Sequence, residues 1–216
     1  MTQEQDRWTP LFQSLFLRDV WTVAKALLGK IIVTRLPEGE TAVRITETEA
    51  YAGELDRACH AYGGRRTKRT EPMFKQGGTL YIYKCYGIHH MLNFVTGREG
   101  EPCAVLIRSG EPLWGIDLMS RRRRGAPIHR LTVGPGSLCA ALGIPLEWSG
   151  QHALTHPNLF LYEDGYIPPS VAQGKRIGVE YAGPDAHQPW RYWIEPSTFV
   201  SHNSRKSITF AERVCE

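Results

Sequence analysis

Two alternating stretches decide the fold of this chain: Lys30-Ile-Ile-Val-Thr-Arg-Leu36 and Thr41-Ala-Val-Arg-Ile-Thr-Glu-Thr-Glu-Ala-Tyr51. The turn formers Pro37-Glu-Gly-Glu40 separate them, which predicts two antiparallel strands joined by a four-residue connection. Just before them, the segment 19–29 begins with a good N-cap residue, has apolar residues at helical spacing and ends in glycine. We therefore expect a short amphipathic helix followed by a hairpin.

The second of these strands carries two glutamates on one face. Its period of two places Ile45, Glu47, Glu49 and Tyr51 on the same side. If that side faces inward, burying the carboxylates costs several kcal/mol unless they are paired or have a chemical role. If it faces outward, they are ordinary solvated glutamates, which are far more common than buried ones. The alternation alone leaves both interpretations open.

Strand patterns dominate the rest of the chain. We expect further strands at 79–86, 91–96, 104–108, 159–162, 176–180 and 191–194, and helices at 111–124 and 137–142. Strands and helices do not alternate regularly, so the prediction is an α+β fold. It is a single compact domain whose curved, mainly antiparallel β-sheet is flanked by helices.

Composition indicates one intracellular domain. The chain has 216 residues, of which 42% are hydrophobic. Its longest apolar run, about residues 103–107, is far shorter than the roughly 20 residues that a membrane span needs. Residues 1–8 are polar and show no secretory signal pattern. We therefore expect no membrane partner.

The cysteines and histidines do not predict a metal centre. The five cysteines are widely spaced and include no Cys-x-x-Cys pair, which favours reduced thiols over a disulfide framework. Cys59-His60 and His89-His90 contain zinc-ligand types, but neighbouring histidines on a strand point to opposite faces. We expect neither a metal nor another cofactor.

Basic and aromatic side chains are clustered. The net charge is only +4, yet Arg65, Arg66, Lys68 and Arg69 form one group and residues 121–124 form another. Such groups suit phosphates, although basic runs are more often solvated surface.

Tyrosines gather on a predicted strand. Tyr81 and Tyr83 share one strand face, while Tyr86 precedes Gly87 at a turn. Together with Tyr51, these rings could stack on nucleobases, or they could pack at the edge of a core as tyrosines in strands commonly do.

Several motifs occur together and in order. They are Glu47-Thr-Glu-Ala-Tyr51, His60, Gly63-Gly-Arg-Arg-Thr67, Gly78-Thr-Leu-Tyr-Ile-Tyr-Lys-Cys-Tyr-Gly87, Asn93, Val105-Leu-Ile-Arg108, Gly134-Pro-Gly-Ser-Leu-Cys-Ala-Ala-Leu-Gly-Ile144 and Arg176-Ile-Gly-Val179. In this combination, over residues 15–202, the chain resembles the alkyladenine (3-methyladenine) DNA glycosylase family, of the methylpurine-DNA glycosylase type.

The resemblance implies an enzyme of base excision repair. It implies a fold similar to the formyltransferase C-terminal domain, with a DNA glycosylase domain at 15–205 between tails at 1–14 and 206–216. The partner would be double-stranded DNA that contains a damaged purine, bound by a monomer. The enzyme would act in the cytoplasm (nucleoid) of a bacterium or the nucleus of a eukaryote.

The resemblance also implies roles for individual residues. Glu49 would be the general base that holds the attacking water, positioned by Arg108. The base pocket would comprise Tyr51, His60, Tyr83, Asn93, Leu106 and the backbone of Ile177. Tyr86 would be the intercalating plug with Ile88 and His89 beside it in the minor groove, and the DNA backbone would meet Arg65, Arg66 and Lys68.

The implied activity is hydrolytic. Flipped-out alkylated or deaminated purines, such as 3-methyladenine, hypoxanthine and ethenoadenine, would lose their N-glycosidic bond and leave an abasic site. No amine stands out as a nucleophile at the matched site, so we expect no lyase step. The alternative is a non-catalytic nucleic-acid-binding module on the same fold. A carboxylate at Glu49 favours the hydrolase, because a pure binder gains nothing from an acidic group against phosphates.

Overall fold

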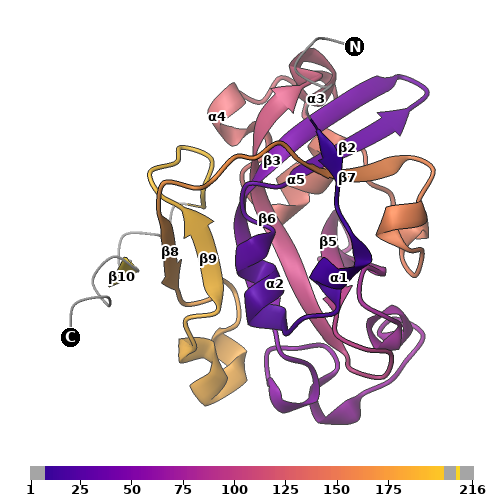
Figure 1. Cartoon of the computed structure of the whole chain (residues 1–216), viewed down its shortest axis with the longest axis vertical. Coiled ribbons are helices and arrows are strands. Elements are labelled where there is room, and N and C mark those ends of the chain that lie inside the picture. The colour runs from indigo at the N-terminus through magenta and orange to yellow at the C-terminus, as the bar shows by residue number, and fades with distance from the viewer. Residues whose placement is uncertain (1–7, 202–207, 210–216) are drawn as a thin grey trace.

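A long antiparallel sheet organises the molecule (Figure 1). The structure is a computed structural model, and it describes residues 8–201 and 208–209. The central path runs β1-β7-β2-β3-β6-β5-β4. Its strands are β1 (Thr9–Pro10), β2 (Ile31–Leu36), β3 (Gly39–Tyr51), β4 (Leu80–Cys85), β5 (His89–Thr96), β6 (Cys103–Trp114) and β7 (Leu159–Glu163). A side branch contains β8 (Val171–Gly174), β9 (Arg191–Ile194) and β10 (Ile208–Thr209).

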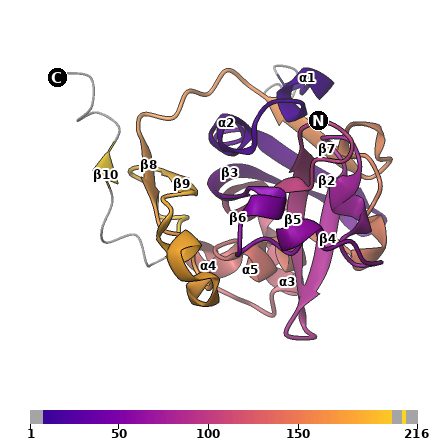
Figure 2. The same ribbon diagram turned by 90° about the horizontal axis from the view of Figure 1, so that it is seen from below.

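Helices cover both faces of this sheet. The α-helices are α1 (Gln13–Phe16), α2 (Val20–Ala26), α3 (Ile116–Arg122), α4 (Ile128–Leu131) and α5 (Pro135–Leu142). The 3-10 helices are η2 (Gly53–Leu55), η3 (Tyr62–Gly64), η4 (Glu71–Phe74), η5 (Leu146–Trp148), η6 (Ala153–Thr155) and η7 (Glu180–His187). Figure 2 shows α2 on one face of the sheet and α4 and α5 on the other. The predicted α+β class is confirmed, and every described strand pair is antiparallel.

Short-range sequence signals explain the helix α2 and the β2–β3 hairpin. Asp19 caps α2, because its carboxylate accepts a hydrogen bond from the backbone N–H of Thr22 at 2.8 Å. The apolar face of α2 enters the main core. The predicted hairpin is present, but its connection is shorter than expected: Leu36 already pairs with Gly39, so only Pro37 and Glu38 form the turn.

The helix predicted at 111–124 is wrong in its first part. Residues 111–114 continue β6 and pair with the N-terminal half of β3. The helix α3 begins only after Gly115, whose φ of +73° lets the chain leave the sheet. A Cβ at this position would lie 2.2 Å from the carbonyl oxygen of Glu40. Strand pairing over a long sequence distance therefore overrides the local helical pattern.

The strand predicted at 176–180 is also wrong. These residues form an irregular segment, and the strand of this region lies earlier, at β8. The reason is that the segment bonds inward. The backbone N–H of Ile177 donates to a side chain of β3 rather than to a neighbouring strand. The other predicted strands and the helix at 137–142 are present with shifted ends.

Two short strands lie outside the domain bounds of 15–205 that the sequence analysis expects. β1 lies within the segment expected as an N-terminal tail and pairs with β7. β10 lies within the expected C-terminal tail and pairs with β8.

The strand β3 connects the whole sheet. It has 13 residues, and β6 runs along one edge of it. Along the other edge, β2 pairs with its first half and β9 with its second half. The second half of β3 is therefore surrounded on both edges.

Three irregularities interrupt the pairing of β3 with β6, and two of them lie beside Glu47. Ile45 pairs with Gly110 and Glu47 with Ser109, which leaves Thr46 as an extra residue on β3. Thr48 then pairs with Ile107, which leaves Arg108 as an extra residue on β6. Bulges of this kind redirect a side chain, and these two flank Glu47.

Candidate active site

A cleft of about 440 Å³ opens beside the C-terminal end of β3. The strands β4, β5 and β6 and the irregular segment after β8 contribute to its walls. It gathers most of the residues that the sequence analysis singled out, namely Tyr51, His60, Tyr83, Tyr86, Asn93, Leu106, Arg108 and Ile177.

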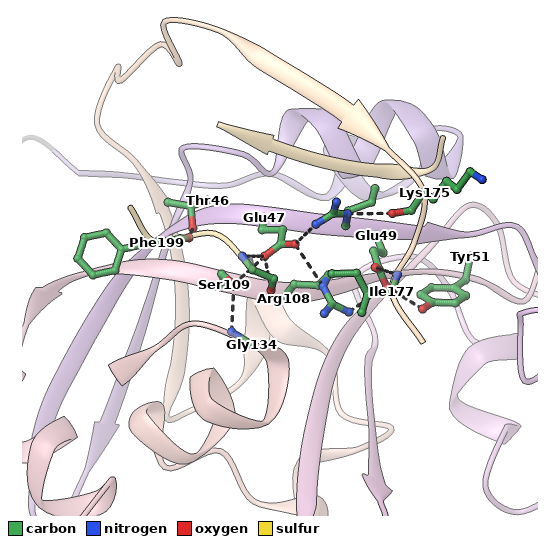
Figure 3. Close-up of polar contacts among 12 residues, drawn as sticks. Thr46, Glu47, Glu49, Tyr51, Arg108, Ser109, Gly134, Lys175, Ile177 and Phe199 are labelled. Carbon is green, nitrogen blue, oxygen red and sulfur yellow. Dashed lines mark hydrogen bonds and ion pairs between the residues drawn. The ribbon is translucent and has the colours of Figure 1, made fainter. Parts of the chain in front are cut away.

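Glu49 lies directly behind this wall and is fully buried. Its Oε1 accepts a hydrogen bond from the backbone N–H of Ile177 at 2.8 Å, and its Oε2 accepts one from the Tyr51 hydroxyl at 2.8 Å. Arg108 Nη1 lies 3.2 Å from Oε2 (Figure 3). The inward-facing alternative of the sequence analysis is therefore the observed one. The carboxylate is buried but satisfied, as a buried charge must be.

Arg108 stands between two carboxylates. Its Nε lies 3.4 Å from Oε1 of Glu47, on the side opposite its contact with Glu49. Burial acts to lower the pKa of Arg108, but the charges of Glu49 and Glu47 raise it above its ordinary value. The guanidinium is therefore a permanent positive charge at the base of the cleft.

Tyr51 is locked on both sides. Burial, followed by the charge of Glu49, raises the pKa of Tyr51 well above the ordinary value. The hydroxyl therefore stays protonated and donates a hydrogen bond to Glu49. The guanidinium of Arg176 lies 4.8 Å from the ring centroid of Tyr51. Arg176 is itself fixed by a bidentate ion pair with Asp56, and both of these side chains are fully buried. This pair holds the segment that supplies the amide of Ile177.

His60 belongs to a network of rings. Its Nδ1 lies 2.7 Å from the Tyr81 hydroxyl, and its ring meets the Tyr83 ring edge-on at 4.6 Å between centroids. Burial, with smaller contributions from Arg69 and Arg65, lowers the pKa of His60 to about 4. His60 is therefore neutral at pH 7. Arg69 donates toward its Nε2 and lies over the Tyr83 ring at 5.0 Å, which assigns the ring proton to Nδ1.

Asn93 and Leu106 are directly paired across β5 and β6. The Asn93 side-chain amide donates to the carbonyl oxygens of Tyr81 at 3.0 Å and Met91 at 3.2 Å. These two bonds fix the orientation of the amide in the cleft wall.

The hairpin between β4 and β5 carries the predicted plug. Tyr86 is 91% exposed and has a φ of +50°, and Ile88 is 74% exposed. His89 is exposed where it starts β5. The hairpin turn projects from the body of the domain (Figure 2).

The predicted phosphate-binding residues have different surroundings. Arg65 lines a second hollow of about 290 Å³ beside the cleft, and Lys68 is exposed. Arg66 instead makes a bidentate ion pair with Glu71 at 2.7 and 2.9 Å. In the second basic group, Arg122 binds Glu38. Its neighbour Arg123 donates to the backbone of Leu131 and to Ser137.

The sequence reasoning missed several residues of this region. Arg176 begins the motif Arg176-Ile-Gly-Val179, but its ion pair with the distant Asp56 was not predicted. Tyr181 of η7 lines the cleft and donates from its hydroxyl to the carbonyl of Ala58. Arg191 and Ser201 bind Glu47 from the C-terminal third. The paired glutamates were the local sequence signal for Arg191 and Ser201, because a buried carboxylate needs partners.

The described residues contain neither a metal-binding cluster nor a membrane-spanning helix. Within 8–201 and 208–209, no cluster of three or more His, Cys, Asp or Glu side chains suits a metal ion. In the same residues, no helix has the length and hydropathy needed to cross a membrane.

Comparison with known proteins is consistent with this geometry. A family model described as "Methylpurine-DNA glycosylase (MPG)" matches residues 14–198. Three relatives carry the name "Putative 3-methyladenine DNA glycosylase". The one from Methanocella arvoryzae is 45% identical over 192 residues, which is 88% of this chain and 95% of that protein. The one from Oceanobacillus iheyensis is 42% identical over 198 residues, or 92% and 98%. The one from Chlamydia abortus is 44% identical over 185 residues, or 84% and 96%.

These matches place the chain among the DNA glycosylases, the enzymes that begin base excision repair. Within that class, the chain belongs to the methylpurine-DNA glycosylase family. The resemblance that the motifs carry is thereby confirmed.

Proposed function

We propose that this chain is a monofunctional glycosylase that acts as a monomer on double-stranded DNA. It extrudes an alkylated or deaminated purine, of the 3-methyladenine, hypoxanthine or ethenoadenine type, and hydrolyses its N-glycosidic bond to leave an abasic site. The observation that carries this proposal is the buried carboxylate of Glu49, held behind an aromatic cleft by Arg108, Tyr51 and the amide of Ile177.

The chemistry needs such a carboxylate. Cleavage of the bond between purine and deoxyribose develops positive charge on the sugar, as in other glycoside hydrolyses. Glu49 stabilises that charge and accepts the proton of the attacking water. The water oxygen bonds to the anomeric carbon, and the base leaves with the electron pair of the broken bond.

The cleft suits a flat base. Tyr51 and Tyr83 supply rings for stacking, and a cationic lesion such as 3-methyladenine gains further from their electron-rich faces. The neutral His60 and the fixed amide of Asn93 offer polar contacts to the base edge. Leu106 completes the apolar part of the wall.

The surface around the cleft suits an opened duplex. A base inside a stacked duplex is out of reach, so the enzyme must extrude the nucleotide and fill the gap. Tyr86 is the exposed ring for that purpose, with Ile88 and His89 beside it. Arg65 and Lys68 are free to meet phosphates, whereas Arg66 must first leave Glu71.

A lyase step has no candidate in the cleft. The lysine that lines it in the described chain is Lys84, and this side chain is exposed at the rim. A covalent step on the sugar needs an amine beside the anomeric carbon. Water is therefore the nucleophile.

Single-turnover release of base tests the proposal. Duplexes with one hypoxanthine or one ethenoadenine, and methylated DNA as a source of 3-methyladenine, are incubated with the native chain and with Glu49→Gln. We expect release by the native chain, a loss of roughly a thousandfold or more in the variant, and lesion binding by both. Strand breaks should appear only after alkali treatment, because abasic sites stay intact without a lyase.

Other outcomes would decide between the alternatives. Folded native protein that binds lesion DNA but releases no base would support the non-catalytic binding module. Undiminished release by Glu49→Gln would keep the glycosylase and remove Glu49 as its base. Strand cleavage without alkali would show a lyase.

A further inference from the structure

The carboxylate of Glu47 is as buried as that of Glu49, yet the hydrolysis just described does not use it. It is fully buried and has partners from three directions. Ser109 Oγ donates to its Oε2 at 2.8 Å, and Ser201 donates from its backbone N–H at 2.9 Å and from its Oγ at 2.8 Å. Arg191 donates to its Oε1 at 3.0 Å (Figure 3 draws this cluster). These donors satisfy the buried charge of Glu47 and fix the position of its carboxylate.

The bulge on β6 gives Glu47 its access to the site. In a regular strand, Arg108 and Ser109 would point to opposite faces. Because Arg108 is the extra residue at this point, both side chains reach Glu47. The same displacement places the guanidinium between Glu47 and Glu49.

Arg108 is positioned by charge as much as by hydrogen bonds. Within the described residues, its buried Nε has no hydrogen-bond partner, although Oε1 of Glu47 lies 3.4 Å away. An ion pair without a directional bond depends on both charges being present. If Glu47 loses its charge, the guanidinium is free to move toward Glu49 alone.

We propose that Glu47 is a positioning residue that holds Arg108 between the two carboxylates, so that its positive charge is shared by Glu47 and Glu49. This inference rests on the proposed function of Glu49 as the general base. The donors from Ser109, Ser201 and Arg191 keep Glu47 ionised: burial acts to raise its pKa, but Arg108 and these donors bring it below the ordinary value. Glu47 is therefore a fixed negative charge that offsets Arg108.

Removing that charge should disturb the geometry at Glu49. A guanidinium that is no longer shared with Glu47 shifts toward Glu49, and Glu49 then loses its alignment with the attacking water. The charged and titratable groups that face Glu49 are Glu47 and Tyr51 on β3, Arg108 on β6, Tyr83 on β4, Arg176 beside Ile177, Tyr181 on η7 and Arg191 on β9. Of these, only Glu47 is a second carboxylate in contact with Arg108.

The test compares Glu47→Gln with the native chain in single-turnover base release and in binding to a lesion duplex. We expect a rate roughly tenfold or more below that of the native chain at pH 7, because a shift of about 1 Å in a positioning group is costly. The affinity for the lesion duplex should stay native, because Glu47 does not line the cleft. Glu47→Asp keeps the charge but shortens the side chain, so it should recover part of the rate that Glu47→Gln loses.

A control and a second measurement make the test decisive. Asp164→Asn breaks the ion pair with Arg44 of β3 at 2.8 Å and should leave rate and affinity unchanged. A crystal structure of Glu47→Gln should show the Arg108 guanidinium displaced from its native position, and this readout does not depend on turnover.

Each result has one meaning. A native rate in Glu47→Gln, or a rate loss with Arg108 in its native position, would overturn the positioning role. If Glu47→Gln does not fold, a native rate in Glu47→Asp would overturn it. If the native chain releases no base, the proposed function fails, and the position of Arg108 in the variant alone decides whether Glu47 positions it.

Discussion

Tyr86 is a large aromatic residue whose ring does not pack in the core. Its side chain is 91% exposed, and its φ of +50° is a conformation that residues with a Cβ rarely adopt. A chain that only had to fold would place a glycine or asparagine here. An exposed ring in a strained turn beside the cleft indicates a role in binding.

We expect Tyr86→Ala to separate stability from function. Its unfolding free energy should change by less than about 0.5 kcal/mol, because the ring makes few contacts in the folded protein. Its affinity for a lesion duplex should fall by roughly tenfold or more, since stacking of one ring contributes about 1 to 3 kcal/mol. Urea unfolding and a fluorescence binding assay measure the two quantities. The control Ile167→Ala removes another side chain, which is 84% exposed, and should change neither the unfolding free energy nor the affinity. If Tyr86→Ala binds the lesion duplex as tightly as Ile167→Ala does, Tyr86 is not an intercalating plug.

The irregular segment after β8 is the element that completes the site. Arg176 donates to the carbonyl of Ala50 and to Asp56, and its guanidinium lies between the rings of Tyr51 and Trp190 at 4.8 and 4.9 Å. The next residue presents its amide to Glu49. A buried ion pair thus anchors a segment that has no strand partner of its own.

Arg176→Met should destabilise the protein by about 3 to 5 kcal/mol, because it leaves Asp56 buried without its counter-charge. Adding Asp56→Asn to this variant should recover part of the loss, as the uncompensated charge is then gone. Urea denaturation measures both. Arg44→Met, at the more exposed ion pair with Asp164, is the matched control and should lose less. An equal loss at the two sites would show that burial of the Arg176 pair adds nothing to the cost of breaking it.

At the scale of the whole molecule, the basic side chains differ in whether they can bind DNA phosphates. The net charge is only +4, and several arginines are already used within the protein. Arg66, Arg122 and Arg123 bind internal acceptors, whereas Arg65 lies in the hollow beside the cleft. Membership of a basic run therefore does not decide which side chains meet DNA.

The salt dependence of DNA binding should reveal this division. The logarithm of the association constant should fall linearly with the logarithm of salt concentration. The double variant Arg65→Gln, Lys68→Gln should reduce that slope by about 1 to 2, since each phosphate contact contributes roughly 0.9. Arg35→Gln, at the distant β2–β3 hairpin, loses a charge without a phosphate contact and should keep the native slope. Equal slopes for all of these proteins would assign Arg65 and Lys68 to ordinary solvated surface.

The sequence by itself determined the local elements and the shared face of the two glutamates. The cap at Asp19 and the alternation of residues 41–51 predict α2 and β3, because these signals act between neighbours in the chain. The alternation also places Glu47 and Glu49 on one face, and in the structure both carboxylates contact Arg108. The motifs identified the family for the same reason, since each of them is contiguous.

Only the tertiary structure decided what surrounds those glutamates. The bulge at Arg108 lies where β6 pairs with the second half of β3, and no short sequence pattern predicts that register. The same long pairing extended β6 through residues 111–114 against their helical pattern. Three residues bind the buried carboxylates from 120 or more residues away along the chain, namely Arg176, Arg191 and Ser201. They are needed there because a buried carboxylate without partners costs free energy.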